Sequence, residues 1–167
     1  MTEKTNILVL CTGNSARSIL GEALLNRLGQ GRVAAFSAGS KPAGAVNPGA
    51  LRLLARESYD VSGFRSKNWA EFTGEAAPRI DIVLTVCGNA AGEACPVFPG
   101  TPVRGHWGLA DPAAVQDDES SIDRAFAETY ELLRCRIEAL LALPFESMPR
   151  AELQERVGEI GALEGAA

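Results

Sequence analysis

The chain has 167 residues, a hydrophobic fraction of 46% and a formal net charge of -5, with a pI near 5.0. This size and composition suit one domain with a substantial core, and no basic cluster reaches the density of a nucleic-acid-binding face. The first residues hold no apolar stretch of signal-peptide length, and no apolar run approaches the length of a membrane span. We therefore expect a cytoplasmic protein that binds neither nucleic acid nor membrane.

Four cysteines, at positions 11, 87, 95 and 135, are the chemically distinctive residues of this composition. In a reducing compartment, catalytic or redox chemistry is a commoner use of cysteine than structural bridging. A zinc site is the competing use, but the chain has a single histidine, His106, and lacks paired Cys-x2-Cys spacings. We predict no metal and no tightly bound cofactor.

The first predicted strand, Asn6 to Leu10, leads directly into a polar loop and then into the apolar spacing of a helix. We call residues 11–17 the oxyanion loop. Backbone amides at a helix start are unpaired and meet the positive end of the helix dipole, and a guanidinium adds a planar fork for an oxyanion. The residues predicted to cradle a tetrahedral oxyanion are Thr12, Gly13, Asn14, Ser15, Ala16 and Arg17.

Cys11 stands at the rim of this cradle. A lone cysteine at a strand end is usually inert packing. The helix N-terminus and Arg17 favour the thiolate, however, against an unperturbed thiol pKa of about 8.5. Ser18 follows Arg17, and its hydroxyl can donate to the thiolate or cap the helix. The Cys-x5-Arg-Ser spacing therefore predicts a nucleophile at Cys11.

Strands and helices alternate along the rest of the chain, which predicts an α/β fold with a small, doubly wound and mostly parallel sheet flanked by helices. Leu20, Leu24, Leu25 and Leu28 are expected on the inner face of the first helix. We divide the chain into an α/β domain over residues 1–145 and a C-terminal helical extension of unknown role over 146–167. Helices are expected over 18–28, 49–57, 121–143 and 151–163, a single helical turn over 69–72, and further strands over 32–37, 80–86 and 103–107.

Cys87 directly follows the apolar strand 80–86. Ligands in open α/β sheets collect at the carboxyl ends of strands, so Cys87 and Cys11 are expected at the same edge. Cys95 lies eight residues further on, beyond Gly88 and Gly92, in a segment able to move. A second thiol can attack the sulfur of an adduct on Cys11, and a third can pass the disulfide on. The spacing alone does not fix which pair closes.

Asp111 precedes Pro112, a pair that commonly starts turns. Beside a thiolate, a carboxylic acid gains another role, because it can protonate a departing oxygen. His106 and Trp107 are expected to serve packing and support rather than catalysis, and Cys135 to be packing or a surface thiol.

These motifs resemble the low-molecular-weight tyrosine phosphatases and, more closely, the thioredoxin-coupled arsenate reductases that share their fold. The resemblance covers roughly residues 5–143. Its motifs are Cys11 to Ser18, Ser37-Ala38-Gly39, Asn47-Pro48, Ile80 to Cys87, Cys95-Pro96, His106-Trp107-Gly108 and Asp111-Pro112-Ala113.

The resemblance implies a role for each predicted site residue. Cys11 would attack arsenate, Arg17 and the loop amides would hold its oxygens, and Ser18 would steady the thiolate. Asp111 would protonate the departing hydroxide. Cys87 would then displace arsenite by attacking Cys11, and Cys95 would attack Cys87 to leave a Cys87–Cys95 disulfide for thioredoxin.

Two departures from the family pattern concern the loop and its surroundings. Some members carry a further cysteine where this chain has Ala16. Some bind potassium through residues that match Asn14, Glu22 and Ser37, together with an acidic residue near position 67. This chain has Lys67 there, and a lysine ammonium can take the place of the cation.

Three functions stay open from the sequence. The first is an arsenate reductase with an external dithiol reductant, for which the Cys87 and Cys95 pair favours thioredoxin over glutaredoxin or mycothiol systems. The second is a tyrosine or aryl phosphatase, although such enzymes usually follow Asp-Pro with an aromatic residue and here Ala113 and Ala114 follow. The third is a redox-sensing oxyanion-binding module, which would leave Asp111 without a use.

Overall fold

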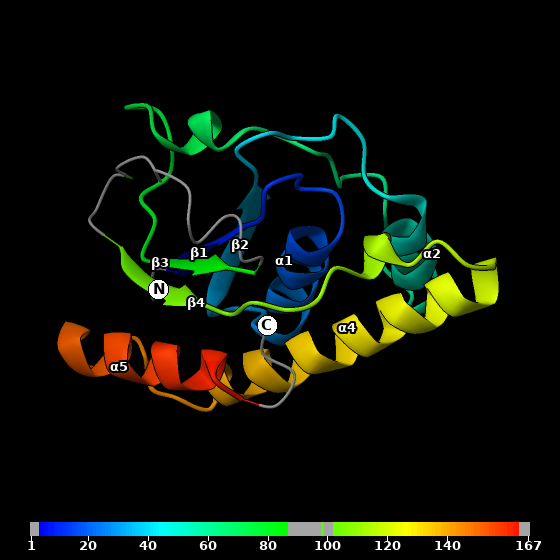
Figure 1. Ribbon diagram of the computed structural model, residues 1–167. Coiled ribbons are helices and arrows are strands. Elements are labelled where there is room, and N and C mark those ends of the chain that lie inside the picture. The colour runs from blue at the N-terminus through cyan, green and yellow to red at the C-terminus, as the bar shows by residue number, and fades with distance from the viewer. Residues whose placement is uncertain (1–3, 87–97, 99–101, 164–167) are drawn as a thin grey trace.

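The computed structural model describes residues 4–86, 98 and 102–163, and Cys87 and Cys95 lie outside the described residues (Figure 1). Its strands are β1 (Thr5–Leu10), β2 (Val33–Ala38), β3 (Ile82–Thr85) and β4 (Val103–His106). Its helices are α1 (Arg17–Leu28), α2 (Pro48–Arg56), α4 (Glu119–Leu141) and α5 (Arg150–Gly161), with short 3-10 turns η1 (Trp69–Phe72) and η2 (Pro112–Ala114).

The four strands form one parallel sheet in the order β2-β1-β3-β4. The chain leaves β1 toward β2 on one side and later returns to add β3 and β4 on the other. The carboxyl ends of β1 and β3 therefore form a topological switch point, the place where open α/β sheets bind ligands. Cys11, the residue after β1, lies at this point.

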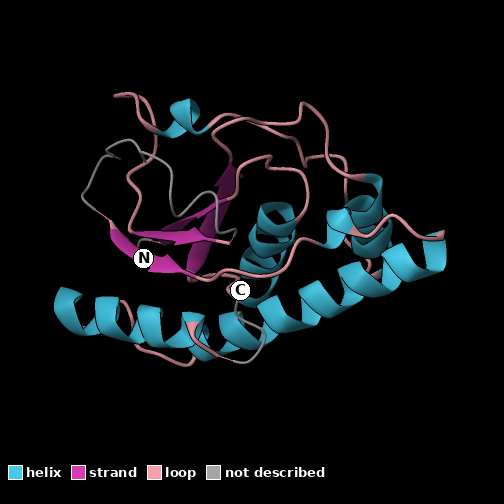
Figure 2. Cartoon of the chain, in the orientation of Figure 1, coloured by secondary structure: helices cyan, strands magenta, loops and turns pink. Residues whose placement is uncertain are grey.

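The two faces of the sheet are covered differently. Ile7 and Val9 belong to a core shared with α1, α2, α4 and α5, whereas Leu8 and Leu10 pack with Phe72 of η1. Figure 2 shows α4 and α5 along the same side of the sheet as α1, with η1 and its flanking loops across the opposite side. The expected α/β fold with a parallel sheet is confirmed.

Three local predictions need correction. β3 begins at Ile82 rather than Ile80, because the Asp81 side chain accepts a hydrogen bond from the Asn6 amide at 2.8 Å. Leu28 is 39% exposed, so the prediction that it faces inward is wrong: it stands in the last turn of α1, beyond the core. α4 begins at Glu119, two residues before the expected start, because Asp118 caps it.

α5 packs along β4, and its predicted inner residues Leu153, Val157 and Ile160 are buried. The Gln154 side chain bonds both the amide and the carbonyl of Arg104, on the side of β4 away from β3. α5 thus covers a strand edge that would otherwise expose unpaired backbone groups. The division at residue 145 stays a prediction.

Among the described helices, none has the length and apolar character needed to cross a bilayer.

Gly49, in the first turn of α2, allows that helix to approach α4. An added Cβ at Gly49 would lie 2.5 Å from Cε2 of Phe126, well inside van der Waals contact. We expect Gly49→Ala to lower the free energy of unfolding by about 1–3 kcal/mol, because the aromatic ring must leave its position. Urea unfolding measures the change. Gly63→Ala is the matched control, since its Cβ would meet nothing within 4 Å and should change stability by less than about 1 kcal/mol. Equal stability of the two variants would contradict the close α2–α4 packing.

Candidate active site

The oxyanion loop is held from outside through its carbonyl groups. Gly39 allows this close approach, because a Cβ there would lie 2.7 Å from the Cys11 carbonyl oxygen. Backbone and side-chain donors from residues 41–47 and 66 then bind the loop carbonyls. These bonds are Lys41 N to Thr12 O (3.0 Å), Ala43 N to Gly13 O (2.9 Å), Asn47 N to Ser15 O (2.9 Å) and Ser66 Oγ to Gly13 O (3.0 Å).

The amides of the same loop are left for another acceptor. Within the described part of the chain, the backbone amides from Gly13 to Arg17 make no hydrogen bond. α1 begins here with Ala16 at its N-cap and no side-chain cap. A row of free amides at an uncapped helix N-terminus binds anions well, because the helix dipole adds a positive field. The loop therefore has the features of the predicted oxyanion cradle.

Asn14 fixes the turn of this loop from within. It is completely buried and adopts a φ of 44°, a left-handed conformation that asparagine tolerates better than most residues. Its Nδ2 donates to the Ser18 hydroxyl at 2.8 Å, and its Oδ1 accepts from the Lys67 amide at 2.8 Å. Because Ser18 accepts this bond with an oxygen lone pair, its own proton remains available to a neighbouring acceptor.

Arg17 is anchored at one nitrogen and available at another. Its Nη1 donates to the carbonyl of Leu109 at 2.8 Å, and its Nη2 lies 3.6 Å from Oδ2 of Asp111. Its Nε is buried and has no partner among the described residues. A fixed guanidinium with a free, desolvated donor suits a bidentate grip on an oxyanion.

The structure brings Asp111 beside Arg17, as a shared site requires. Oδ1 of Asp111 accepts from the Ala113 amide at 2.9 Å and caps the turn η2, so one carboxyl oxygen is held while the other faces Arg17. The Asp111 side chain is 42% exposed, which allows proton exchange with water. Its position suits proton transfer to a group bound in the cradle.

A partly buried ionic cluster supports the loop from the side of β2. The Ser37 hydroxyl donates to Glu22 Oε1 at 2.7 Å, and Lys67 Nζ lies 3.6 Å from the same oxygen and 3.5 Å from Ser37 Oγ. Burial lowers the pKa of the Lys67 ammonium, and the Glu22 carboxylate opposes that shift. The ammonium lies beside Glu22 and Ser37, two of the three residues that resemble a potassium site, and the Lys67 backbone amide bonds the third, Asn14. Across residues 4–86, 98 and 102–163, no three His, Cys, Asp or Glu side chains gather to hold a metal.

The thiols beyond Cys11 are only partly described. Cys87 and Cys95 lie outside the described residues. Val86, which precedes Cys87, donates its amide to the carbonyl of Leu10, which precedes Cys11, at 2.9 Å. In the sequence, Cys11 and Cys87 therefore follow the ends of two adjacent strands, β1 and β3. Cys135 is exposed on α4.

Trp107 is buried and packs as predicted, whereas His106 is exposed and its Nδ1 lies 2.8 Å from Thr85 Oγ1. Two contributors to the site were not predicted from the sequence, the carbonyl of Leu109 and the amide of Lys67. Both are backbone groups brought in by tertiary contacts, so no side-chain pattern could have marked them.

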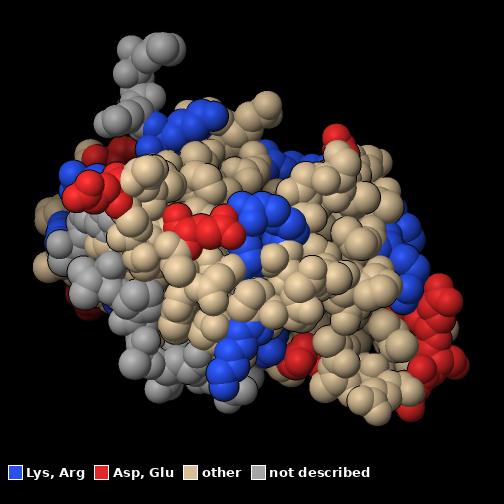
Figure 3. Space-filling model, turned by 90° about the horizontal axis from the view of Figure 1, so that it is seen from above, with Lys and Arg blue, Asp and Glu red and all other residues tan. Residues whose placement is uncertain are grey.

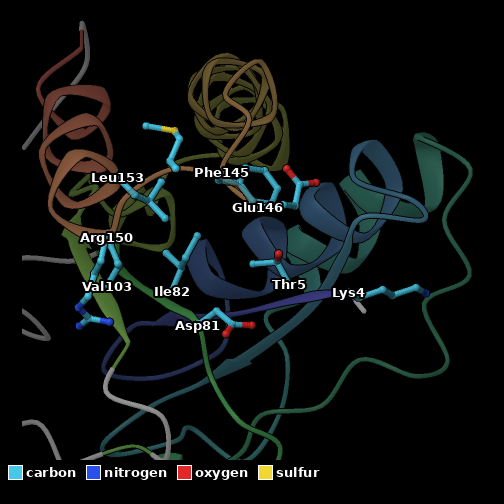
Figure 4. Close-up of a pocket in the computed structure, with 10 residues that line it drawn as sticks. Lys4, Thr5, Asp81, Ile82, Val103, Phe145, Glu146, Arg150 and Leu153 are labelled. Carbon is cyan, nitrogen blue, oxygen red and sulfur yellow. The ribbon is translucent and has the colours of Figure 1, made fainter. Parts of the chain in front are cut away.

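Among the described residues, the charged side chains on the face viewed from above do not form one large basic area (Figure 3). Figure 3 shows separate groups of basic and acidic side chains on the face viewed from above. A cavity of about 390 Å³ lies at the opposite, amino end of the strands, between Thr5, Ile82 and Leu153 (Figure 4). Its position separates it from the oxyanion loop. The positive field expected at the oxyanion loop is therefore a local one, from its backbone amides and Arg17.

The comparisons with known proteins agree with this geometry. Residues 6–157 match the family model described as low molecular weight phosphotyrosine protein phosphatase. An arsenate reductase of Brevibacillus brevis is 34% identical over 139 residues, which cover 78% of this chain and all of that protein. The crystal structure of an arsenate reductase from Archaeoglobus fulgidus superposes with a TM-score of 0.59 at 28% identity, over 79% of this chain and 98% of that one.

A thioredoxin-dependent arsenate reductase of Corynebacterium glutamicum shares the fold, with a TM-score of 0.55 and 24% identity, over 85% of this chain and 65% of that one. The family match spans β1, the oxyanion loop and Asp111, and extends into α5. The chain belongs to the low molecular weight phosphotyrosine protein phosphatase family and, within it, groups with the arsenate reductases.

Proposed function

We propose that this protein reduces arsenate to arsenite with a nucleophilic Cys11 and two further thiols. The observation that carries the proposal is the row of amides from Gly13 to Arg17, which make no hydrogen bond within the described part of the chain; the row begins two residues after Cys11 and ends at Arg17, beside Asp111. Such a site holds a tetrahedral oxyanion next to a thiolate and a proton donor. The match covers 100% of one relative named arsenate reductase and 81% of another.

The first step forms a bond between the Cys11 sulfur and arsenic. The thiolate attacks As(V), the loop amides and Arg17 hold the remaining oxygens, and Ser18 donates to the thiolate before attack. Hydroxide leaves and takes a proton from Asp111, so that water departs. Arsenic is still As(V) in this adduct, and no electrons have yet been transferred.

The next two steps move the oxidation to the other cysteines. Cys87 thiolate attacks the Cys11 sulfur, a disulfide forms, and the sulfur–arsenic electron pair leaves with arsenic as arsenite. Cys95 then attacks Cys87 and releases Cys11 as a thiolate. Two thiols have supplied two electrons, and the Cys87–Cys95 disulfide holds the oxidising equivalents. The proposal for these residues rests on the family resemblance and on the adjacent strand ends.

An external dithiol protein must then reduce that disulfide. We propose thioredoxin as the reductant, since the C. glutamicum neighbour is thioredoxin-dependent and an intramolecular disulfide between Cys87 and Cys95 suits such a partner. A reductant of this kind places the reaction in the cytoplasm. Detoxification of arsenic is the role that such a reaction serves.

Aryl phosphate hydrolysis is the second candidate, and the family match supports it. Phosphate and arsenate share charge and shape, so the cradle and Asp111 serve both. The aromatic pair Tyr59 and Tyr130 gives no ring to a phosphotyrosine slot beside Asp111, because their hydroxyls bond to each other at 3.0 Å in the core between the loop after α2 and α4. Hydrolysis is therefore proposed as a side activity.

Cys87→Ser separates reduction from hydrolysis. We expect the variant to lose multiple-turnover arsenate reduction with thioredoxin, since the Cys11 adduct cannot be resolved, and to hydrolyse p-nitrophenyl phosphate at the wild-type rate. Cys11→Ser should lose both activities. Disulfide mapping by mass after one arsenate turnover without reductant locates the product bond. Equal loss of both activities in Cys87→Ser would count against the thiol relay.

Asp111→Asn tests the proton donor. We expect a fall of about 10²–10⁴-fold in turnover of phenyl phosphate, whose leaving group needs a proton, and a much smaller fall for 2,4-dinitrophenyl phosphate, whose leaving group does not. Steady-state kinetics with both esters give the ratio. The same loss on both esters would show that Asp111 acts only on binding or folding.

From the position of Lys67 we predict that the thermal stability of the protein does not depend on potassium. In wild-type protein the ammonium already neutralises Glu22, so the melting temperature should be the same in potassium chloride and in tetramethylammonium chloride at one ionic strength. Lys67→Gln leaves the Glu22 carboxylate without its cation, so potassium should raise its melting temperature by several degrees more than tetramethylammonium does. Lys41→Gln, a substitution in the exposed loop, is the control. A potassium response in the wild type would refute this role of Lys67.

A further inference from the structure

α5 contacts the chain at the point where it turns toward the active site. Nε1 of Trp107 donates to the carbonyl of Val157 at 2.9 Å, and this bond is buried. Gly161, the last residue of α5, lies directly against the carbonyl of His106, where an added Cβ would collide with that oxygen and would lie 2.9 Å from Cδ1 of Trp107. The outer side of the His106–Trp107 segment is thus fixed by α5.

The inner side of the same segment is fixed by β3. The Trp107 amide donates to the Thr85 carbonyl at 2.6 Å, and the Leu109 amide donates to the Val86 carbonyl at 3.1 Å. Trp107 and Leu109 are 1% and 2% exposed, so neither can shift without opening the core. The segment is therefore clamped between a strand and a helix.

The clamped segment leads straight to the catalytic machinery. The Leu109 carbonyl accepts the Nη1 bond of Arg17, and Asp111, two residues later, lies 3.6 Å from Nη2. The position of both groups depends on the backbone between Trp107 and Asp111. A small displacement of a positioned catalytic group is costly in rate.

α5 is in turn anchored at both ends of its contact. Gln154 bonds the backbone of Arg104 at the edge of β4, and the Arg136 side chain of α4 donates to the Leu163 carbonyl at 3.2 Å, just beyond the end of α5. These bonds hold α5 against β4 and α4, so α5 can fix the position of the backbone that it contacts as well as cover the strand edge.

We propose that the C-terminal helix α5 acts as a positioning element for the proton donor, with Trp107 and Gly161 as its positioning residues. Through them it holds the Leu109–Asp111 backbone so that Asp111 reaches the leaving oxygen. This inference rests on the proposed function, because it assigns α5 a role in that reaction.

Gly161→Ala is the test, with Gly158→Ala as its matched control. Both substitutions add one methyl group to α5. A Cβ at Gly158 would meet nothing within 4 Å, whereas a Cβ at Gly161 must push α5 away from His106. We expect Gly161→Ala to lower turnover of phenyl phosphate about tenfold more than turnover of 2,4-dinitrophenyl phosphate, and to slow arsenite release in a single turnover to a similar degree. Gly158→Ala should match the wild type in all three assays.

A second variant and a double mutant keep the test decisive if Gly161→Ala folds poorly. Trp107→Phe removes the Nε1 donor and keeps the ring, and it should show the same unequal loss between the two esters. In an Asp111→Asn background, Gly161→Ala should add less than about twofold, since the group it misplaces is already absent. Circular dichroism and thermal melting establish the folded fraction.

Two outcomes would overturn the inference. If the wild type is active but Gly161→Ala and Trp107→Phe behave like Gly158→Ala, or lose turnover of both esters to the same degree, α5 has only a structural role. A wild-type protein that releases no arsenite and hydrolyses neither ester would instead overturn the proposed function itself.

Discussion

The outward hydrogen bonds of the oxyanion loop are the constraint on which the rest of the site depends. A peptide unit places its carbonyl and its amide on opposite sides, so fixing the carbonyls of Thr12, Gly13 and Ser15 to the flanking segments decides where the amides face. The donors come from residues 41–47 and 66, which are distant in sequence. The proposed binding of an anion by an acidic chain is consistent with this arrangement, because each amide contributes a fixed partial charge at short range, whereas the net charge of -5 acts over a larger distance and is screened by salt.

The Lys67 cluster serves the same constraint. Glu22 is 15% exposed at its side chain and would be costly as an unpaired charge, so the Lys67 ammonium and the Ser37 hydroxyl compensate it. The backbone amide of Lys67 also holds Asn14, the left-handed residue at the centre of the loop. One residue therefore joins charge compensation to loop geometry. A tethered ammonium does this without depending on the concentration of an ion in solution, because it is part of the chain.

The sequence carries enough information to predict the parts of the fold that follow from local patterns. β1, the oxyanion loop and α1 are predictable because an apolar strand, a polar loop and an amphipathic helix follow one another within residues 6–28. Leu28 was misassigned because helical periodicity predicts which side a residue occupies but not how far the core extends along the helix. The start of β3 was misplaced because the Asp81 side chain bonds the Asn6 amide, a contact between residues 75 positions apart.

The same distinction applies to the site. The side chains of Cys11, Arg17 and Asp111 were predicted from spacing and resemblance, and the structure places Arg17 and Asp111 together. The carbonyl of Leu109 was not predicted, since a backbone acceptor leaves no trace in residue type and its position depends on the hydrogen bond between the segment after β4 and Val86. Lys67 was noticed as a departure from the family pattern, but only the fold shows that its backbone also reaches the loop.

The contacts of α5 give a physical reason why a terminal helix matters to chemistry at the far side of the sheet. Cys11 and the loop amides lie between β1 and α1, which are fixed by the core, whereas Asp111 stands on a connection after β4, the last strand of the sheet. An edge strand is paired on one side only, so its outer side needs another partner before the connection that follows it can be held in place. α5 supplies that partner through Gln154 and Trp107. The connection that carries Asp111 is thus held from both sides of β4, by pairing with β3 on one side and by α5 on the other, although α5 lies far from Asp111 in the sequence.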